Sequence, residues 1–245
     1  MTDWSQLSHA HGSAENIPPL LDQLEPDPAA ECWEELWAQL CPEGTVHPAS
    51  LAALPRLAAV AGEWPPEDRG MIMALAGAIM AGTRRSSEFG DMPRRHAGDV
   101  STLLRLTEES LRSPELAGDP HTFLILLQAM LAFEGVPVWD QRLEGLADEE
   151  YEVDCPDCGV SLFIAIGEYG FFASAGDYAT DEDAPRTPLV PSDPDRLEGV
   201  AKRLHAIADE AGQDKVSAGL THLFGAATCT ACGETFSVAD RVATT

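Results

Sequence analysis

The residues of this sequence best suited to chemistry are four cysteines in two short turns. The turns read CPDCG at residues 155–159 and CTACG at residues 229–233, and 70 residues separate Cys158 from Cys229. A gap of two residues lets both sulfurs of a turn reach one ion about 2.3 Å away. The glycine after each turn supplies the positive φ that lets backbone amides fold over the sulfurs. The pattern therefore predicts one structural Zn²⁺ site with four ligands: Cys155, Cys158, Cys229 and Cys232.

Two other uses of these cysteines stay open at the level of sequence. Redox-active proteins typically carry a single CxxC motif at the start of a helix. This sequence has two such motifs, and each precedes an expected strand. Disulfides are the other alternative, but six cysteines in 245 residues are too few for a secreted disulfide scaffold. A site closed by four thiolates has no open position for a substrate, so the expected role of zinc is structural.

The sequence patterns of common enzymes are missing. There is no HExxH, no Gly-x-Ser-x-Gly, no phosphate-binding loop and no dinucleotide fingerprint. A zinc deaminase would combine His-x-Glu with Pro-Cys-x-x-Cys, and neither occurs. His9 and His11 could bind a metal together, but polar contacts are their simpler role. We therefore expect no enzymatic activity.

The segments around the cysteines predict a small β unit. Apolar runs over 160–166 and 171–174 flank a Gly-Glu-Tyr-Gly turn, which predicts a β-hairpin, and residues 235–238 predict a third strand. The interval between the cysteine turns also holds an acidic loop at 177–183, a helix from Asp193 to Gly212 and a helix over 216–224. The two cysteine turns and this order of strands resemble a zinc ribbon. The 70-residue interval is far longer than a minimal ribbon needs.

Apolar residues recur with helical spacing in the first 150 residues. A stripe over 17–24 predicts a helix that Pro26 should end. Pro28 should open the next helix, with Asp27 as its N-cap. Further apolar helices are expected over 32–40, 71–80 and 123–133. Three helix pairs at intervals of roughly 40 residues are typical of an α-solenoid.

Residues 1–140 resemble bacterial HEAT-like repeat proteins. The likeness rests on Pro55 inside a first helix, Asp-Pro before the second helices, and the patterns WSQLSHAHGSA at residues 4–14 and GTVHPA at residues 44–49. It implies a mainly α fold, in which a HEAT-like array of about three helical hairpins occupies residues 1–147. A small α+β zinc-ribbon-like domain with a helical insertion would follow over 148–245, after a solvated linker at 148–150.

Two features of the helical half allow more than one role. A polar insertion over 82–98 carries Arg84, Arg85, Arg94 and Arg95. It could bind phosphate, but pairing with the chain's own carboxylates is expected in so acidic a protein. Trp33 and Trp37 could anchor a partner, although tryptophans spaced among leucines usually fill a core.

The charge of the chain points to its partners. With 41 acidic and 15 basic residues, the formal net charge is −26. Such a field repels nucleic acid and anionic membranes and favours encounter with basic proteins. Solubility or salt tolerance is the alternative reason for the acidity. We expect a protein-binding module for a basic partner, in its most specific form an immunity protein against a cationic toxin. The candidate contacts are Glu34, Glu35, Asp181, Glu182 and Asp183.

Other function classes remain as alternatives. Zinc ribbons often contact RNA or DNA, so a nucleic-acid-associated regulator is the second hypothesis, although basic residues are scarce near the cysteine turns. A scaffold protein, or an enzyme without a recognisable motif, is the third. The first 20 residues do not resemble a signal peptide, and the apolar run over 71–81 is too short to span a bilayer. A cytoplasmic location without membrane contact is therefore expected.

Overall fold

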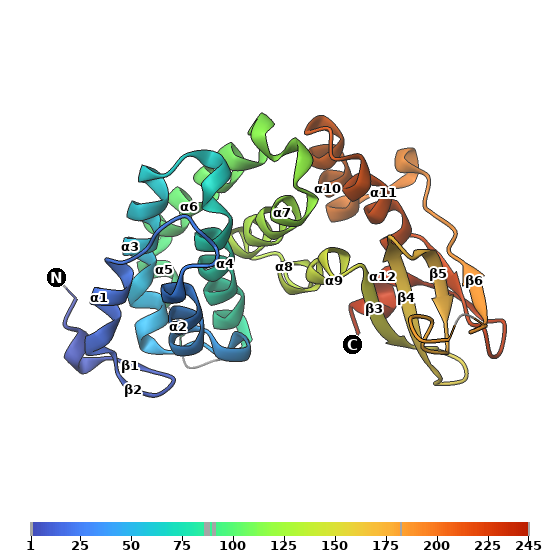
Figure 1. Cartoon of the computed structure of the whole chain (residues 1–245), viewed down its shortest axis with the longest axis horizontal. Coiled ribbons are helices and arrows are strands. Elements are labelled where there is room, and N and C mark those ends of the chain that lie inside the picture. The colour runs from blue at the N-terminus through green and yellow to red at the C-terminus, as the bar shows by residue number, and fades with distance from the viewer. Residues whose placement is uncertain (1, 86–88, 90–91, 182, 245) are drawn as a thin grey trace. The chain divides into compact units, whose positions relative to one another are not determined.

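The computed structural model of the chain describes residues 2–85, 89, 92–181 and 183–244 (Figure 1). Two compact units are present. The first comprises Met1–Leu116 with Ile125–Gln141, and the second comprises Ala117–Leu124 with Arg142–Thr245. The sequence predicted a domain boundary after residue 147. In the structure residues 142–147, together with the first turn of one helix at 120–124, belong to the second unit.

In its described residues, the first unit is helical apart from loops and one short hairpin with two-residue strands. The short hairpin consists of β1 (Ser8–His9) and β2 (Gly12–Ser13). The helices are α1 (Ile17–Leu21), α2 (Glu31–Leu40), α3 (Pro48–Glu63), α4 (Gly70–Arg85), α5 (Met92–Arg95), α6 (Ala97–Leu111), α7 (Pro120–Glu134) and α8 (Trp139–Arg142). Because every long helix carries an apolar stripe, the helices bury one another.

The helices pack in two series. α1 contacts α3 and α3 contacts α6, whereas α2 contacts α4. At Gly77 in α4 an added Cβ would lie 2.9 Å from the Cα of Ala129 in α7, so glycine permits a close approach of these two helices. Within pairs, α1 packs on α2 and α3 packs on α4. The core at these contacts includes Leu36, Leu51, Leu54, Leu57, Ile72 and Leu75, all fully buried.

Several helix predictions are confirmed and others are wrong. Pro55 lies inside α3, as predicted, and Trp33 fills the core with 2% exposure. Pro28 does not open a helix. The Asp27 carboxylate instead accepts a hydrogen bond from the amide of Ala29 (2.9 Å), which holds a turn, and α2 begins at Glu31. The first helix ends at Leu21, earlier than Pro26 requires.

The predicted polar insertion over 82–98 is largely helical. α4 continues to Arg85, and α5 and α6 begin at Met92 and Ala97, while residues 86–88, 90 and 91 lie outside the described part. Arg84 forms an ion pair with buried Asp140 and donates to the carbonyl of Ala132 (3.1 Å). For Arg84, the expected pairing with an internal carboxylate is confirmed.

In its described residues, the second unit contains a four-stranded sheet, a two-stranded sheet and four helices besides the first turn of α7. The antiparallel order β3-β4-β5-β6 is formed by Glu150–Asp154, Ser161–Gly167, Gly170–Ser174 and Arg186–Pro188. β7 (Ala226–Thr228) pairs with β8 (Thr235–Ser237). The helices are α9 (Glu144–Ala147), α10 (Gly199–Glu210), α11 (Asp214–Leu223) and α12 (Val238–Val242). The predicted hairpin is confirmed as β4–β5, whereas β3, β6 and β7 were not predicted.

The expected solvated linker over 148–150 is wrong at its end, because β3 starts at Glu150. Its inward side chains, Tyr151 and Val153, are buried. The Tyr151 hydroxyl donates to the carbonyl of Arg142 (2.9 Å), which ties the strand to the helical turn before it. The chain therefore enters the sheet without a free linker.

Among the described residues, no helix combines the length and the apolar composition needed to cross a bilayer.

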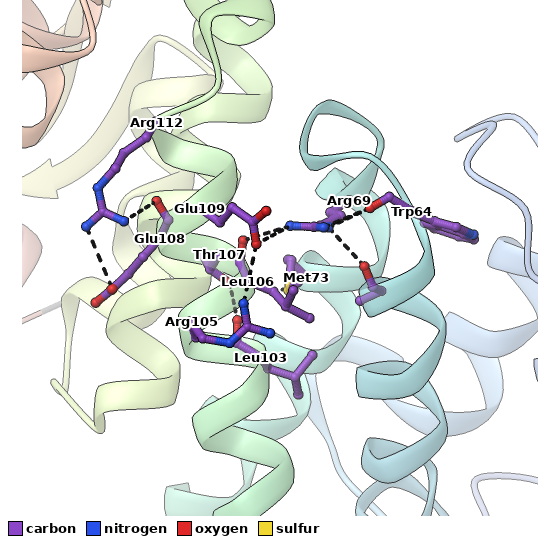
Figure 2. Close-up of polar contacts among 11 residues, drawn as sticks. Trp64, Arg69, Met73, Leu103, Arg105, Leu106, Thr107, Glu108, Glu109 and Arg112 are labelled. Atoms are coloured by element: carbon purple, nitrogen blue, oxygen red, sulfur yellow. Dashed lines mark hydrogen bonds and ion pairs between the residues drawn. The ribbon is translucent and has the colours of Figure 1, made fainter.

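A buried arginine joins two parts of the first unit (Figure 2). Arg69 is only 4% exposed. Its guanidinium donates to the carbonyls of Ala61 and Trp64 (2.8–3.0 Å), near the end of α3, and to that of Leu106 in α6 (3.4 Å). It also pairs with Glu109 at 3.3 Å. Because carbonyls at a helix end lack intrahelical partners, Arg69 satisfies the carbonyls of Ala61 and Trp64 at the end of α3, while its bond to Leu106 links this end to α6.

We predict that Arg69→Met destabilises the first unit by about 3 kcal/mol, since it leaves buried carbonyls unpaired. Glu109→Gln should cost less than about 1 kcal/mol, because that carboxylate is half exposed. All five tryptophans lie in the first unit, so urea unfolding followed by tryptophan fluorescence measures its stability. Equal effects of the two substitutions would contradict the assigned role of Arg69.

Candidate metal centre

The four cysteines of the two turns come together in the second unit. Their Sγ atoms all lie within 4.8 Å of one another. Two pairs bridge the turns: Cys155 to Cys232 at 3.6 Å and Cys158 to Cys229 at 3.8 Å. None of the four is in a disulfide. In each turn the first cysteine is buried and the second is exposed, so the cluster lies at the surface of the unit.

Each cysteine turn is the loop of an antiparallel hairpin. The first connects β3 to β4, where Asp154 pairs with Ser161, and the second connects β7 to β8, where Thr228 pairs with Thr235. The two turns have the same backbone hydrogen bonds. Cys155 N donates to Val160 O (2.9 Å), as Cys229 N donates to Glu234 O (2.8 Å). Two hairpins of the same local design therefore present their sulfurs to a common point.

The glycine that ends each turn has the expected conformation. Gly159 has a φ of 70° and Gly233 a φ of 81°, in the left-handed region that favours glycine. The amide of Gly159 donates to Cys155 O and that of Gly233 to Cys229 O, both at 3.0 Å. These bonds close the turns around the sulfurs.

Backbone amides also face the sulfur atoms. Hydrogen bonds from the amides of Cys158 and Asp157 lower the pKa of the Cys155 thiol to about 7. The amide of Ala231 donates to the sulfur of Cys229 (3.4 Å). For Cys232 the amide of Glu234 acts to lower the pKa, but desolvation and the neighbouring thiols outweigh it and raise the pKa to about 12. One thiolate forms readily, whereas several thiolates this close together need a cation between them.

The geometry and the donor set fit a metal ion. Four sulfurs at about 2.3 Å from a tetrahedral ion would be about 3.8 Å apart, close to the two cross-turn distances. Four thiolates suit zinc or iron. The site would then have four protein ligands and no open coordination position.

Contacts outside the hairpins hold the two turns in register. The amide of Ala175, after β5, donates to the hydroxyl of Thr230 inside the second turn (3.2 Å). The side chain of Thr187 in β6 donates to the carbonyl of Thr228. Arg241 in α12 donates to the carbonyl of Asp154 beside the first turn (2.9 Å). Both sheets and the last helix thus position the cysteines.

Comparison with known proteins adds no family. No family model, curated protein or solved structure gives a significant match. The site must be interpreted from its own residues.

The predicted partner-binding residues lie in different units. Glu34 and Glu35 are exposed on α2 of the first unit. Glu35 accepts from the side chain of Gln39 (2.9 Å), so part of its carboxylate is engaged internally. Asp181 and Asp183 are exposed in the loop after β5, where Asp181 accepts from the amide of Asp183 (3.0 Å). Glu182 lies outside the described residues.

His9 and His11 do not gather further metal-binding groups among the described residues. The ring of His9 accepts a hydrogen bond from the amide of His11 (3.1 Å), and the two rings meet edge to face. This is a local turn contact, consistent with a polar role at the start of the chain.

Sequence reasoning missed one feature of the second unit, a cavity of about 510 Å³. Its walls come from α7, α9, β4, β5 and α11. No short sequence pattern could have revealed it, because the lining residues are spread over a hundred positions of the chain.

We predict that Cys155→Ser abolishes stoichiometric metal binding and unfolds the second unit. Structural zinc contributes on the order of 10 kcal/mol in small modules, and the buried sulfur of Cys155 is part of the cluster. Metal content by mass spectrometry and far-ultraviolet circular dichroism during heating, with and without a chelator, would measure both effects.

The matched control is Cys32→Ala, which removes a buried thiol of the first unit. It should keep its metal. Tryptophan fluorescence, which reports the first unit, should change little in Cys155→Ser. A Cys155→Ser protein that binds one metal per chain and melts like the parent would rule out the assignment.

Proposed function

We propose that this protein is an acidic protein-binding module that recognises a basic partner and uses a structural zinc ion to hold its C-terminal unit together. In this proposal the first unit is a HEAT-like array and the second unit is a zinc-ribbon-like domain. The partner is a protein, and the location is cytoplasmic. The most specific form is an immunity-type inhibitor of a cationic toxin.

The observation that carries the proposal is the net charge of −26. Several of the 15 basic residues are already paired with internal carboxylates. Arg56 pairs with Asp22 (3.0 Å), Arg105 with Glu109 (3.4 Å) and Arg84 with Asp140. These pairs leave a large excess of carboxylates to generate a negative field. Such a field raises the rate of encounter with basic proteins and suppresses binding to acidic ones.

The packing of the first unit supports a HEAT-like array. In stacked helix pairs, first helices contact first helices and second helices contact second helices. α1, α3 and α6 contact one another in that sequence, while α2 contacts α4 and α4 approaches α7. Arrays of this type offer extended surfaces to partners, although fold alone does not assign a function.

The cysteine cluster supports a structural role for the metal. Zinc is the proposed ion, because closed Cys₄ sites in hairpin turns of this spacing are typical of structural zinc. With four protein ligands, no coordination position remains for a substrate. This ligand number and the lack of enzyme motifs support a non-enzymatic role.

Electrostatics disfavours the nucleic-acid alternative. Asp154, Asp157 and Glu234 lie beside the cysteine turns and are exposed. A backbone-binding surface needs a cluster of lysines and arginines. The chain has only six basic residues after residue 150. The same turns would therefore repel phosphates at physiological salt.

We predict that the immobilised holoprotein captures basic proteins from nuclease-treated lysate of its source cells, and that binding weakens as salt rises. For an identified partner, Glu34→Gln/Glu35→Gln and Asp181→Asn/Asp183→Asn should each reduce affinity roughly threefold to tenfold at low salt. Biolayer interferometry across a salt series measures this.

The matched control is Asp209→Asn/Glu210→Gln, which removes two exposed charges at the end of α10. It should weaken binding less than either of the other pairs. Captured proteins whose isoelectric points match those of the whole lysate would refute the proposal, as would binding that is insensitive to salt.

A further inference from the structure

The cavity of the second unit is apolar inside. Leu124, Leu146, Ile166 and Val216 line it, and each is at most 7% exposed. At about 510 Å³ the cavity has room for one or two large side chains, within the usual range of ligand pockets. The walls come from separate helices and from β4, so the cavity is a product of the fold of this unit.

The solvent-exposed part of the cavity lining, its opening, carries mainly acidic side chains. Glu168 and Asp214 are exposed, Glu149 is half-buried, and the three residues contribute three carboxylates. Lys215 and His121 are the cationic or potentially cationic groups beside them. With one positive charge on Lys215 and none on His121, the three carboxylates give the opening a net negative charge. A ligand with an apolar group next to positive charges would be complementary to both the apolar walls and the acidic opening of the cavity.

Glu149 is held in place before any ligand arrives. Its φ of 61° is unusual for a residue with a side chain and costs energy unless the surroundings enforce it. The amide of Glu168 donates to its carboxylate (2.6 Å), and the amide of Ile166 donates to its carbonyl (2.8 Å). A Cβ at Gly167 would collide with this carboxylate. The carboxylate is therefore fixed at the rim, which reduces the entropic cost of binding.

Phe171 provides a rigid apolar surface at the same opening. It is 38% exposed and lines the cavity. Its ring stacks on that of His222, with centroids 4.0 Å apart and an angle of 14°. The side chain of His222 is itself held by a hydrogen bond with the carbonyl of Ala218 (2.8 Å). A partly exposed aromatic ring in a fixed position is typical of binding hot spots.

We propose that this cavity is the docking site for a basic segment of the partner protein, in which one aliphatic or aromatic side chain enters the cavity and flanking lysines or arginines meet Glu149, Glu168 and Asp214. The inference rests on the proposed function, which supplies a basic protein as partner. It adds the place of contact and the chemistry that the segment needs.

The test uses the metal-loaded full chain and a fluorescein-labelled peptide, Lys-Lys-Leu-Lys-Lys, at low ionic strength. Anisotropy should show saturable binding. Replacing the central leucine by glycine should weaken it about tenfold or more, since a buried leucine is lost. Replacing the lysines by glutamates should abolish it. Methyl resonances of Leu124, Leu146 and Ile166 should shift on titration.

Protein variants separate the cavity from the general charge. Ala218→Phe places a ring in the cavity and should abolish binding without changing the charge. Its control, Ala206→Phe, adds the same ring on exposed α10. Glu168→Gln and Asp214→Asn should each weaken binding about twofold to fourfold, whereas Asp209→Asn should have a smaller effect and Lys215→Glu should strengthen it.

The outcomes distinguish this inference from the proposed function. Binding that Ala218→Phe abolishes and Ala206→Phe preserves supports the cavity as the docking site. Equal binding to both variants, or equal affinity for the leucine and glycine peptides, overturns the cavity while leaving an acidic protein-binding role intact. If no cationic peptide binds and lysate capture also finds no basic protein, both proposals fail.

Discussion

The second unit depends on one constraint, which is that four sulfurs from two distant turns occupy a space less than 5 Å across. Each turn is specified locally, by a two-residue gap, a glycine with positive φ and the strands on either side. Their meeting is not local. The 70 residues between them form β4, β5, β6, α10, α11 and β7 before the second turn begins. The contacts of Thr187, Thr230 and Arg241 fix where the chain comes back. A shared metal ion would couple the folding of the two turns, because neither turn alone supplies all four ligands.

The sequence predicted what is encoded in short windows. Cysteine spacing, the hairpin around residues 167–170 and the apolar faces of the long helices all depend on neighbours within about ten residues, and the structure contains them. β7 was missed because its sequence, AAT, carries little strand propensity by itself. β3 was missed although Tyr151 and Val153 alternate with acidic residues, because the acidic run at 148–150 was interpreted as a solvated linker. Their strand conformation comes from pairing with β4 and β8 across a cysteine turn. Pro28 failed as a helix start because the side chain of Asp27 offers the backbone a competing turn.

The features that link distant parts of the chain were beyond such reasoning. In the sequence, Arg69 is an ordinary charged residue in a Pro-rich connection. In the structure it is buried and donates to the carbonyls of residues 61, 64 and 106. Asp140 is buried against Arg84 in the same way. The cavity of the second unit also requires five elements to be placed before it exists. In each case the sequence supplies the residue type. Only the tertiary contacts determine whether the side chain is solvated, forms an ion pair or lines the cavity.

The acidity of the chain and the cysteine cluster are physically coupled. Four thiolates with one Zn²⁺ would still leave two negative charges, next to the carboxylates of Asp154, Asp157 and Glu234. The backbone amides around the sulfurs offset part of this repulsion, but desolvation and the neighbouring thiols still raise the pKa of Cys232. A negative field on this scale therefore raises the free energy of the folded unit. Solubility needs far fewer charges than this. The proposed basic partner would relieve the same repulsion on binding. That relief would contribute to the affinity of the complex.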